Sequence, residues 1–136
     1  MESIITIIEL NTSIIVKGII ILIGYLLTFK ITSLLVKKIV IKNKNSIDAD
    51  GDGKINEKDE KIIRDGYIIG KCENIIILSF ILVGEVTGLA LIFAAKSLAR
   101  QKDINDNAGF FLAGTMVNFT ATLIMAYGLK FLLNLI

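Results

Sequence analysis

Three long apolar stretches constrain this chain more than any other feature of its sequence. They cover residues 14–35, 74–95 and 108–129, and each has close to the roughly 20 residues that a helix needs to cross a bilayer core. They are apolar nearly all round, whereas the helices of a soluble bundle keep a polar face. A soluble chain of 136 residues could not cover so much apolar surface. The sequence therefore predicts a single all-α membrane domain, residues 1–136, with three transmembrane helices.

The residues before the first stretch are not typical of a cleavable signal peptide. Glu2 and Glu9 stand where a basic region is expected, and no small-residue cleavage site follows the apolar run. Two interpretations of residues 1–13 stay open. They form either an interfacial helix followed by a cap at residues 11–13, or an extension of the first span.

Most of the charge lies in a polar loop, residues 37–73, between the first two spans. Within it, residues 48–59 have the spacing of an EF-hand calcium loop, with oxygen-bearing side chains at positions 1, 3, 5, 9 and 12 and glycine at position 6. Gly53 supplies the sharp turn, because glycine enters positive φ without steric cost. The predicted ligands of one Ca²⁺ are the side chains of Asp48, Asp50, Asp52, Asn56 and Asp59 and the backbone carbonyl of Lys54.

The end of this loop departs from the usual EF-hand pattern. Asp59 stands at position 12, where most EF-hands have a bidentate glutamate, and the combination resembles the calcium loops of cellulosomal dockerins. Glu60 is an alternative ligand, and Ile55 is expected to pin the loop to a core or to a partner loop. A short helix is predicted from Glu57 to about Asp65, either ending there or continuing into the second span. The competing interpretation is a solvated acidic turn, which leaves the register of the oxygen-bearing residues unexplained.

The distribution of Lys and Arg predicts an orientation. Residues 37–71 contain nine of them, residues 96–107 contain three, and the first ten residues contain none. The positive-inside rule then places the polar loop in the cytoplasm and the connection 96–107 outside. A cytoplasmic site would meet scarce, variable calcium and act as a sensor, whereas an external site would be permanently loaded and structural. The lysines nearest the membrane are expected to contact anionic lipids: Lys37, Lys38, Lys42 and Lys44.

Glu85 is the polar residue inside the predicted spans that most needs an explanation. It lies in the middle of the second span, where an ionisable group costs several kcal/mol and needs a partner. Lys96 follows eleven residues later on nearly the same face, and Lys17 of the first span is another candidate partner. Glu85 is therefore part of an ion or proton pathway or, as we prefer, a hydrogen-bonded group that holds helices together.

The third span carries a polar face centred on Asn118. Thr115 and Thr122 are three residues before it and four after it, so the three side chains share one side of the helix. Gly84 and Gly88 of the second span form a small-xxx-small pair that lets helices approach closely. Both features favour contacts between helices over a polar pore lining.

Residues 66–135 resemble the C-terminal membrane segment of a family of small uncharacterised prokaryotic membrane proteins, a domain of unknown function. Asn74, Glu85 and Gly109 depart from that family, which has arginine, glutamine and an acidic residue there. The resemblance implies an integral membrane fold and no established activity. The residues that carry it are Gly66-x-x-Ile69-Gly70-x-x-Glu73, Ala94-Ala95-Lys96-Ser97 and Phe111-Leu112-x-Gly114-Thr115.

Enzyme and nucleic-acid functions are not expected. The chain has no histidine, no glycine-rich phosphate loop, no base near Cys72, and no basic patch with interleaved aromatics. Two hypotheses remain. The first is a calcium-responsive channel or transport component, a homo-oligomer in which calcium loops pair between copies. The second is a membrane scaffold, or a partner of another membrane subunit, in which calcium is a structural staple. They differ in whether Glu85, Lys96 and Asn118 face a hydrated interior or dry helix contacts.

Overall fold

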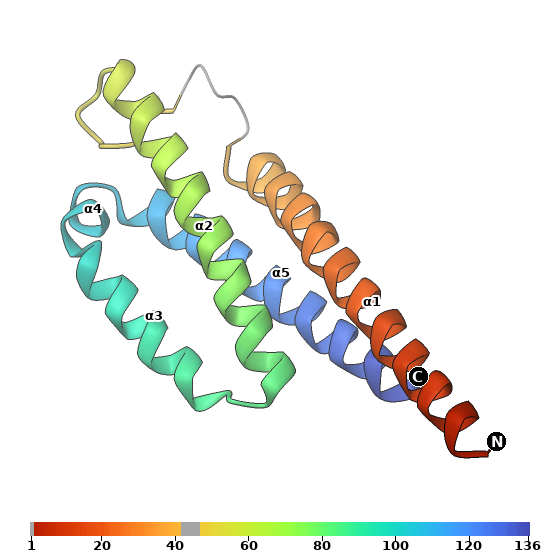
Figure 1. The fold of residues 1–136 in the computed structure, drawn as a ribbon. Coiled ribbons are helices and arrows are strands. Elements are labelled where there is room, and N and C mark those ends of the chain that lie inside the picture. The colour runs from red at the N-terminus through yellow and green to blue at the C-terminus, as the bar shows by residue number, and fades with distance from the viewer. Residues whose placement is uncertain (1, 42–46) are drawn as a thin grey trace.

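The computed structural model describes residues 2–41 and 47–136, with the side chains of 10–41, 47–98, 100–101 and 105–136. Lys42 and Lys44, two of the predicted lipid anchors, lie outside the described residues. The described part of the chain is entirely helical in its regular structure, which confirms the all-α prediction (Figure 1). Its helices are α1 (Glu2–Ile39), α2 (Glu57–Val83), α3 (Thr87–Ala99), α4 (Gln101–Asp106) and α5 (Ala108–Leu135).

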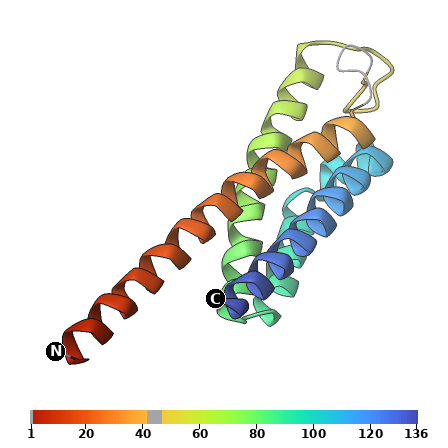
Figure 2. The ribbon, with the colours of Figure 1, turned by 90° about the vertical axis from the view of Figure 1, so that its right-hand side faces the viewer.

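Three of these helices are long and apolar enough to cross a membrane: α1 from Leu10 onward, α2 and α5. The first is continuous from Glu2, so residues 2–13 belong to the same helix as the first span, and the expected cap at residues 11–13 lies inside that helix. No proline or glycine interrupts the chain before Gly18, which is the physical reason for this continuity. Figure 2 shows the N-terminal part of α1 reaching beyond the other helices.

The second span differs from the prediction in its bounds. The helix that begins at Glu57 continues through Gly66 and Gly70 and ends at Val83, so the predicted span 74–95 is wrong. It ends there because Gly84 adopts a left-handed conformation, with φ of 86° and ψ of 8°. The N–H groups of residues 84 and 85 close the helix by donating to carbonyl oxygens in its last turn.

Gly84 and Gly88 therefore do not form a small-residue pair along one helix. Gly84 is a helix C-cap, whereas Gly88 lies in the first turn of α3 against the ring of Phe80. A Cβ atom at Gly88 would lie 2.5 Å from Cε1 of Phe80. The missing side chain thus lets the start of α3 pack closely on α2.

The α3 helix returns the chain toward the end from which α2 started. Its 13 residues span about 20 Å, less than the roughly 30 Å of a bilayer core. Consequently α4 and the start of α5 lie at the same end as residues 47–56, as Figures 1 and 2 both show. Asn107 Nδ2 donates to the carbonyl oxygen of Asp48 at 3.0 Å. The prediction that residues 37–73 and 96–107 lie on opposite sides is therefore wrong.

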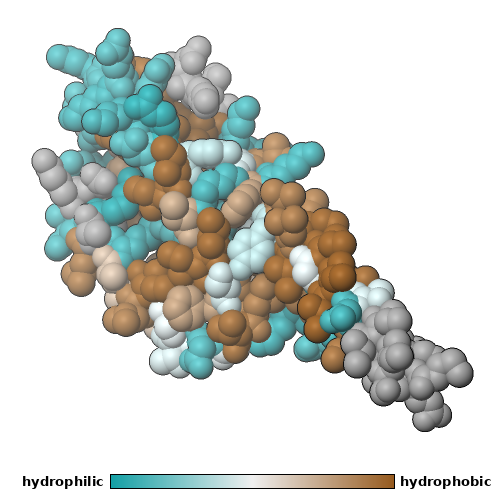
Figure 3. Space-filling view, viewed as in Figure 1, coloured by the Kyte–Doolittle hydropathy of each residue, from teal (hydrophilic) through white to brown (hydrophobic). Residues whose placement is uncertain are grey.

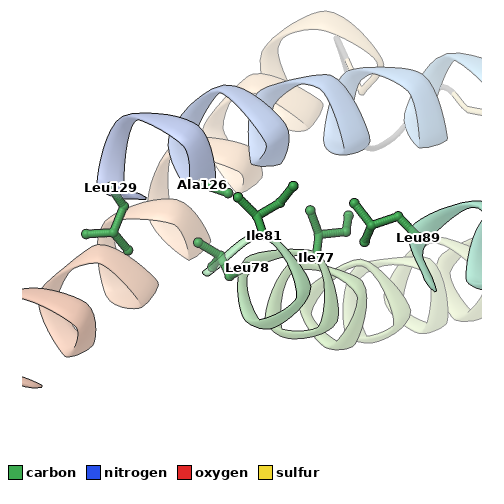
Figure 4. Close-up of a cluster of buried hydrophobic side chains, with 6 residues drawn as sticks. All are labelled: Ile77, Leu78, Ile81, Leu89, Ala126 and Leu129. Carbon is green, nitrogen blue, oxygen red and sulfur yellow. The ribbon is translucent and has the colours of Figure 1, made fainter. Parts of the chain in front are cut away.

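The apolar core lies toward the other end of the molecule. It is formed by buried side chains of α2, α3 and α5 (Figure 4), namely Ile77, Leu78, Ile81, Leu89, Ala126 and Leu129. Gly24 lets α5 pack closely against α1, because a Cβ atom at this position would lie 2.5 Å from Cδ2 of Leu129.

Many large apolar side chains cover the outside of the helices, while hydrophilic residues gather at the loop end (Figure 3). This pattern fits contact with lipid along the helices.

The helix end at Gly84 generates a test of the fold. Gly84→Ala should lower the free energy of unfolding by about 1 kcal/mol, because a Cβ disfavours positive φ. Gly84→Asn should cost less, because asparagine tolerates this conformation. Gly18→Ala is the matched control. It lies within α1 with nothing within 4 Å of the new Cβ, and should be neutral or stabilising. Thermal unfolding in detergent measures all three, and equal effects of the two alanine substitutions would contradict the left-handed cap.

Candidate metal site and polar cavity

Three acidic residues of the loop come together. Asp48, Asp50 and Asp52 each offer a carboxylate oxygen, and these oxygens lie within 4.8 Å of one another. Oxygens on opposite sides of a Ca²⁺ ion are separated by about 5 Å, since each Ca–O distance is roughly 2.3–2.6 Å. The three carboxylates could therefore hold one metal ion, and their hard oxygen donors suit Ca²⁺.

Backbone geometry explains how so short a segment gathers these groups. Gly51 and Gly53 have φ values of 75° and 80°, which turn the chain sharply on both sides of Asp52. Asp48 then accepts the N–H of Gly53 at 2.7 Å and that of Asp52 at 3.1 Å. These bonds fold the loop back over its own first carboxylate.

Asp50 has a second partner in the first turn of α2. Its Oδ2 atom lies 2.5 Å from Nζ of Lys58. The hydrogen bond from Lys58 holds the pKa of Asp50 below its usual value, so the carboxylate stays ionised at lower pH than an ordinary aspartate. An ionised carboxylate is what a metal requires, although Lys58 competes for one of its oxygens.

The last two predicted side-chain ligands have a different role. Asn56 is the N-cap of α2 and accepts the N–H of Lys58 at 2.8 Å. Asp59 is almost completely buried and accepts the N–H groups of Asn56 at 2.8 Å and Ala49 at 2.7 Å. The two residues form a capping box that ties both ends of the loop to α2. The three-carboxylate group thus contains neither of them, and a metal-binding role for Asn56, Asp59 and the Lys54 carbonyl stays a prediction.

The loop is anchored to the rest of the protein by Ala49 and not by Ile55. Ala49 is fully buried, whereas Ile55 is 56% exposed, so the expectation that Ile55 packs on this chain's own core is wrong. Gly51 lies against the end of α4, because a Cβ there would lie 2.8 Å from the carbonyl oxygen of Asp106. Together with the Asn107–Asp48 hydrogen bond, this contact docks the acidic loop on the junction between α4 and α5.

A cavity of about 100 Å³ lies between α1, α2, α3 and α5, in the half of the molecule nearer the loop. Apolar side chains form part of its wall, including Val36, Val40, Ile62, Ile63 and Phe110. Its polar lining is Thr32, Ser33, Tyr67, Lys71, Glu73, Asn74, Lys96, Arg100, Thr115 and Asn118. Two of the three predicted intramembrane polar residues, Lys96 and Asn118, are in this set.

The third predicted residue, Glu85, lies elsewhere. It is exposed in the turn between α2 and α3, so its predicted position in the middle of a span is wrong. Lys96 instead forms an ion pair with Glu73 across α2 and α3, with about 17% and 15% of the two side chains exposed. Asn118 of α5 lies on the other side of Glu73, its Nδ2 atom 3.4 Å from Oε2. An ionic contact thus joins α2 to α3, and a long hydrogen bond joins α2 to α5.

Asn74 is a buried polar residue that hydrogen-bonds to two other helices. Its Nδ2 atom donates to Oγ1 of Thr32 in α1, and its Oδ1 atom accepts from Oγ1 of Thr122 in α5, both at 2.8 Å. Sequence reasoning identified Thr122 but missed Asn74 and Thr32 as contacts between helices. A signal was present for Thr32, a polar residue within an apolar segment, whereas Asn74 stands at the edge of one, directly after Glu73.

Lys71 was also missed as an interior residue. Its Nζ atom donates to Oγ of Ser33 at 2.6 Å and to the carbonyl oxygen of Phe29. It also lies 5.0 Å from the ring centroids of Phe29 and Tyr67. Among the described residues its contacts are all with neutral groups.

Comparison of the chain with known proteins found no match. No family model matches the chain, and no curated protein or solved structure does so either. The resemblance of residues 66–135 to a family of small membrane proteins therefore stays a prediction.

The Glu73–Lys96 ion pair generates a second test. Glu73→Gln should lower the free energy of unfolding by roughly 1–3 kcal/mol, because Lys96 keeps its charge in a largely buried place. Adding Lys96→Met should recover part of this loss, since the uncompensated charge is then gone. Glu57→Gln is the control, an exposed carboxylate on the same helix that should change stability by less than about 0.5 kcal/mol. Additive losses in the double variant, measured by denaturation in detergent, would contradict the pairing.

Proposed function

We propose that this chain is an integral membrane protein whose loop 48–59 binds one Ca²⁺, and that the ion regulates how α2 packs against α5. The observation that carries the proposal is the docking of the acidic loop on the α4–α5 junction. The loop is thereby attached to two of the three helices that are long enough to span a membrane. A ligand of the loop can then act on the membrane domain.

The donor set supports calcium as that ligand. Three carboxylates that share one small volume repel one another, and a divalent cation removes this repulsion. Oxygen donors of this kind suit Ca²⁺ better than softer metals. The register of the loop, with glycine at its sixth position and a helix starting at its tenth, is that of an EF-hand calcium loop.

The path from the ion to the membrane domain is short. Asp59 ties the loop to the start of α2, and Asn107 ties it to the start of α5. One or two turns further on, Ile62 of α2 and Phe110 of α5 line the cavity. Calcium that orders the loop would therefore fix the spacing of α2 and α5 at the loop end of the cavity.

Conduction through a single copy is less well supported. The cavity lies toward the loop end, and the apolar cluster around Leu78 and Ile81 fills the interior beyond it. A channel or transporter would therefore need a path between copies. Ile55 supports a homo-oligomer, because it is exposed at the loop position through which EF-hand loops pair. We accordingly favour calcium regulation of an oligomer over transport by one chain.

The charge distribution supports a cytoplasmic loop. Twelve of the fifteen Lys and Arg residues lie between residues 37 and 107. The fold brings the two connections that contain most of them to one end, whereas the turn at residues 84–86 has none. The positive-inside rule therefore applies to the whole loop end. A calcium site there would respond to changes in cytosolic calcium.

Calcium binding is tested by its effect on thermal stability. Calcium at about 100 times its Kd should stabilise the purified protein by about 2.7 kcal/mol, provided that it binds only the folded loop. Asp48→Asn with Asp52→Asn should abolish this shift, because two of the three gathered carboxylates are lost. Glu57→Gln with Asp65→Asn is the matched control, since it removes the same charge from the start of α2 outside the predicted ligand set. A calcium-dependent shift that survives in the first pair would refute the site.

Orientation is tested by labelling single cysteines in intact cells with a membrane-impermeant thiol reagent. In a Cys72→Ser background, Lys54→Cys and Asn105→Cys should be protected and Glu85→Cys should react, because the first two lie at the loop end and the third at the opposite end. The opposite result would place the loop outside and favour the structural-staple alternative. Different labelling of positions 54 and 105 would contradict the fold itself.

A further inference from the structure

We propose that the polar cavity between α1, α2, α3 and α5 binds a phosphate group, either that of an anionic lipid headgroup or free phosphate. This site is separate from the acidic loop, and the proposal does not rest on calcium binding there. Three observations carry the proposal: the charge of the lining, the arrangement of its hydrogen-bond donors, and its place in the molecule.

The lining has more positive than negative charge. Among the residues whose side chains the structure describes, it contains Lys71, Lys96 and Arg100, the last stacked on the ring of Phe111, and one carboxylate, that of Glu73. Glu73 is committed to Lys96. Lys71 has no ion pair among the described residues, although it lies inside a helix that is long enough to span a membrane. A cation in such a place is costly without a counter-charge, so the cavity favours an anionic ligand.

The lining also presents neutral donors beside these cations. The hydroxyls of Tyr67 and Thr115 belong to the same cavity, as does the amide of Asn118, whose Nδ2 atom also lies 3.4 Å from the carbonyl oxygen of Gly70 and from Oε2 of Glu73. Two glycines of α2 keep space in front of the donors. A Cβ at Gly66 would lie 4.0 Å from Nη1 of Arg100, and one at Gly70 would lie 3.6 Å from Nδ2 of Asn118. Larger side chains at either glycine would extend into the space that a ligand would use.

The position of the cavity suits a lipid headgroup. It lies in the half of the molecule nearer the loop, where most Lys and Arg residues are found. Basic pockets between transmembrane helices at the basic face of a membrane protein are a recurring place for anionic headgroups. The volume of about 100 Å³ is several times that of one water molecule, enough for a tetrahedral oxyanion. Apolar residues such as Val36 of α1 and Val40, just after its end, would contact the glycerol and the first part of an acyl chain.

The test is a binding titration of the full-length protein, purified in an uncharged detergent. Dioctanoyl phosphatidylglycerol, dioctanoyl phosphatidylcholine and inorganic phosphate are added separately, and thermal unfolding reports binding. Phosphatidylglycerol should bind at least about tenfold more tightly than phosphatidylcholine if a lipid headgroup is the ligand. Saturation by inorganic phosphate with no gain from phosphatidylglycerol would identify free phosphate instead. The absence of a shift with both phosphatidylglycerol and phosphate would overturn the proposal.

Variants locate the site. Lys71→Met should weaken binding of the effective ligand about tenfold or more, because a charged hydrogen bond to the phosphate is lost. Arg100→Gln is a second, independent variant that serves if Lys71→Met fails to fold. Lys61→Met is the matched control, since Lys61 is exposed on α2 at the same end and does not line the cavity. Equal weakening by Lys61→Met would show that surface charge alone attracts the ligand, and would overturn the proposal.

Discussion

The polar contacts of Asn74 and Glu73 are the interactions on which the helix packing depends. In a bilayer, the apolar faces of helices gain little by leaving lipid for one another, so close packing and polar contacts must hold the helices together. Asn74 joins α1, α2 and α5 in one hydrogen-bonded chain, and Glu73 joins α2 to α3. Both residues lie in the middle of α2, which is thereby bonded to α1, α3 and α5. The closely packed glycines at positions 24 and 88 complete the contacts.

The turn at Gly84 has the largest consequence for the organisation of the protein. Because the chain reverses there, α3 carries it back toward the loop end before α5 begins. The start of α5 can then contact the acidic loop through Asn107. A continuous span over residues 74–95 would have carried this junction to the opposite side of the membrane. The reversal also brings Lys96 to Glu73, its partner beside the cavity.

The acidic loop and the polar cavity lie close together and differ in charge. The loop gathers three carboxylates, whereas the described side chains that line the cavity include three cations and one carboxylate. Each site is suited to a ligand of opposite sign, and the first turns of α2 and α5 connect them. Binding at either site would restrict the same two helices, which is the physical basis for coupling between the two ligands.

The sequence by itself determined the features that depend on local patterns. Apolar stretches long enough to cross a bilayer predicted three such helices, and the spacing of Asp48, Asp50 and Asp52 predicted that their carboxylates would gather. Only the tertiary structure decided where the second span ends and which residues pair inside. Gly84 in an apolar run is compatible with a continuous helix, and only its left-handed conformation against α3 and α5 ends the span. Likewise the partner of Lys96 depends on a chain reversal and not on spacing, because contacts between helices are set by which faces meet in space.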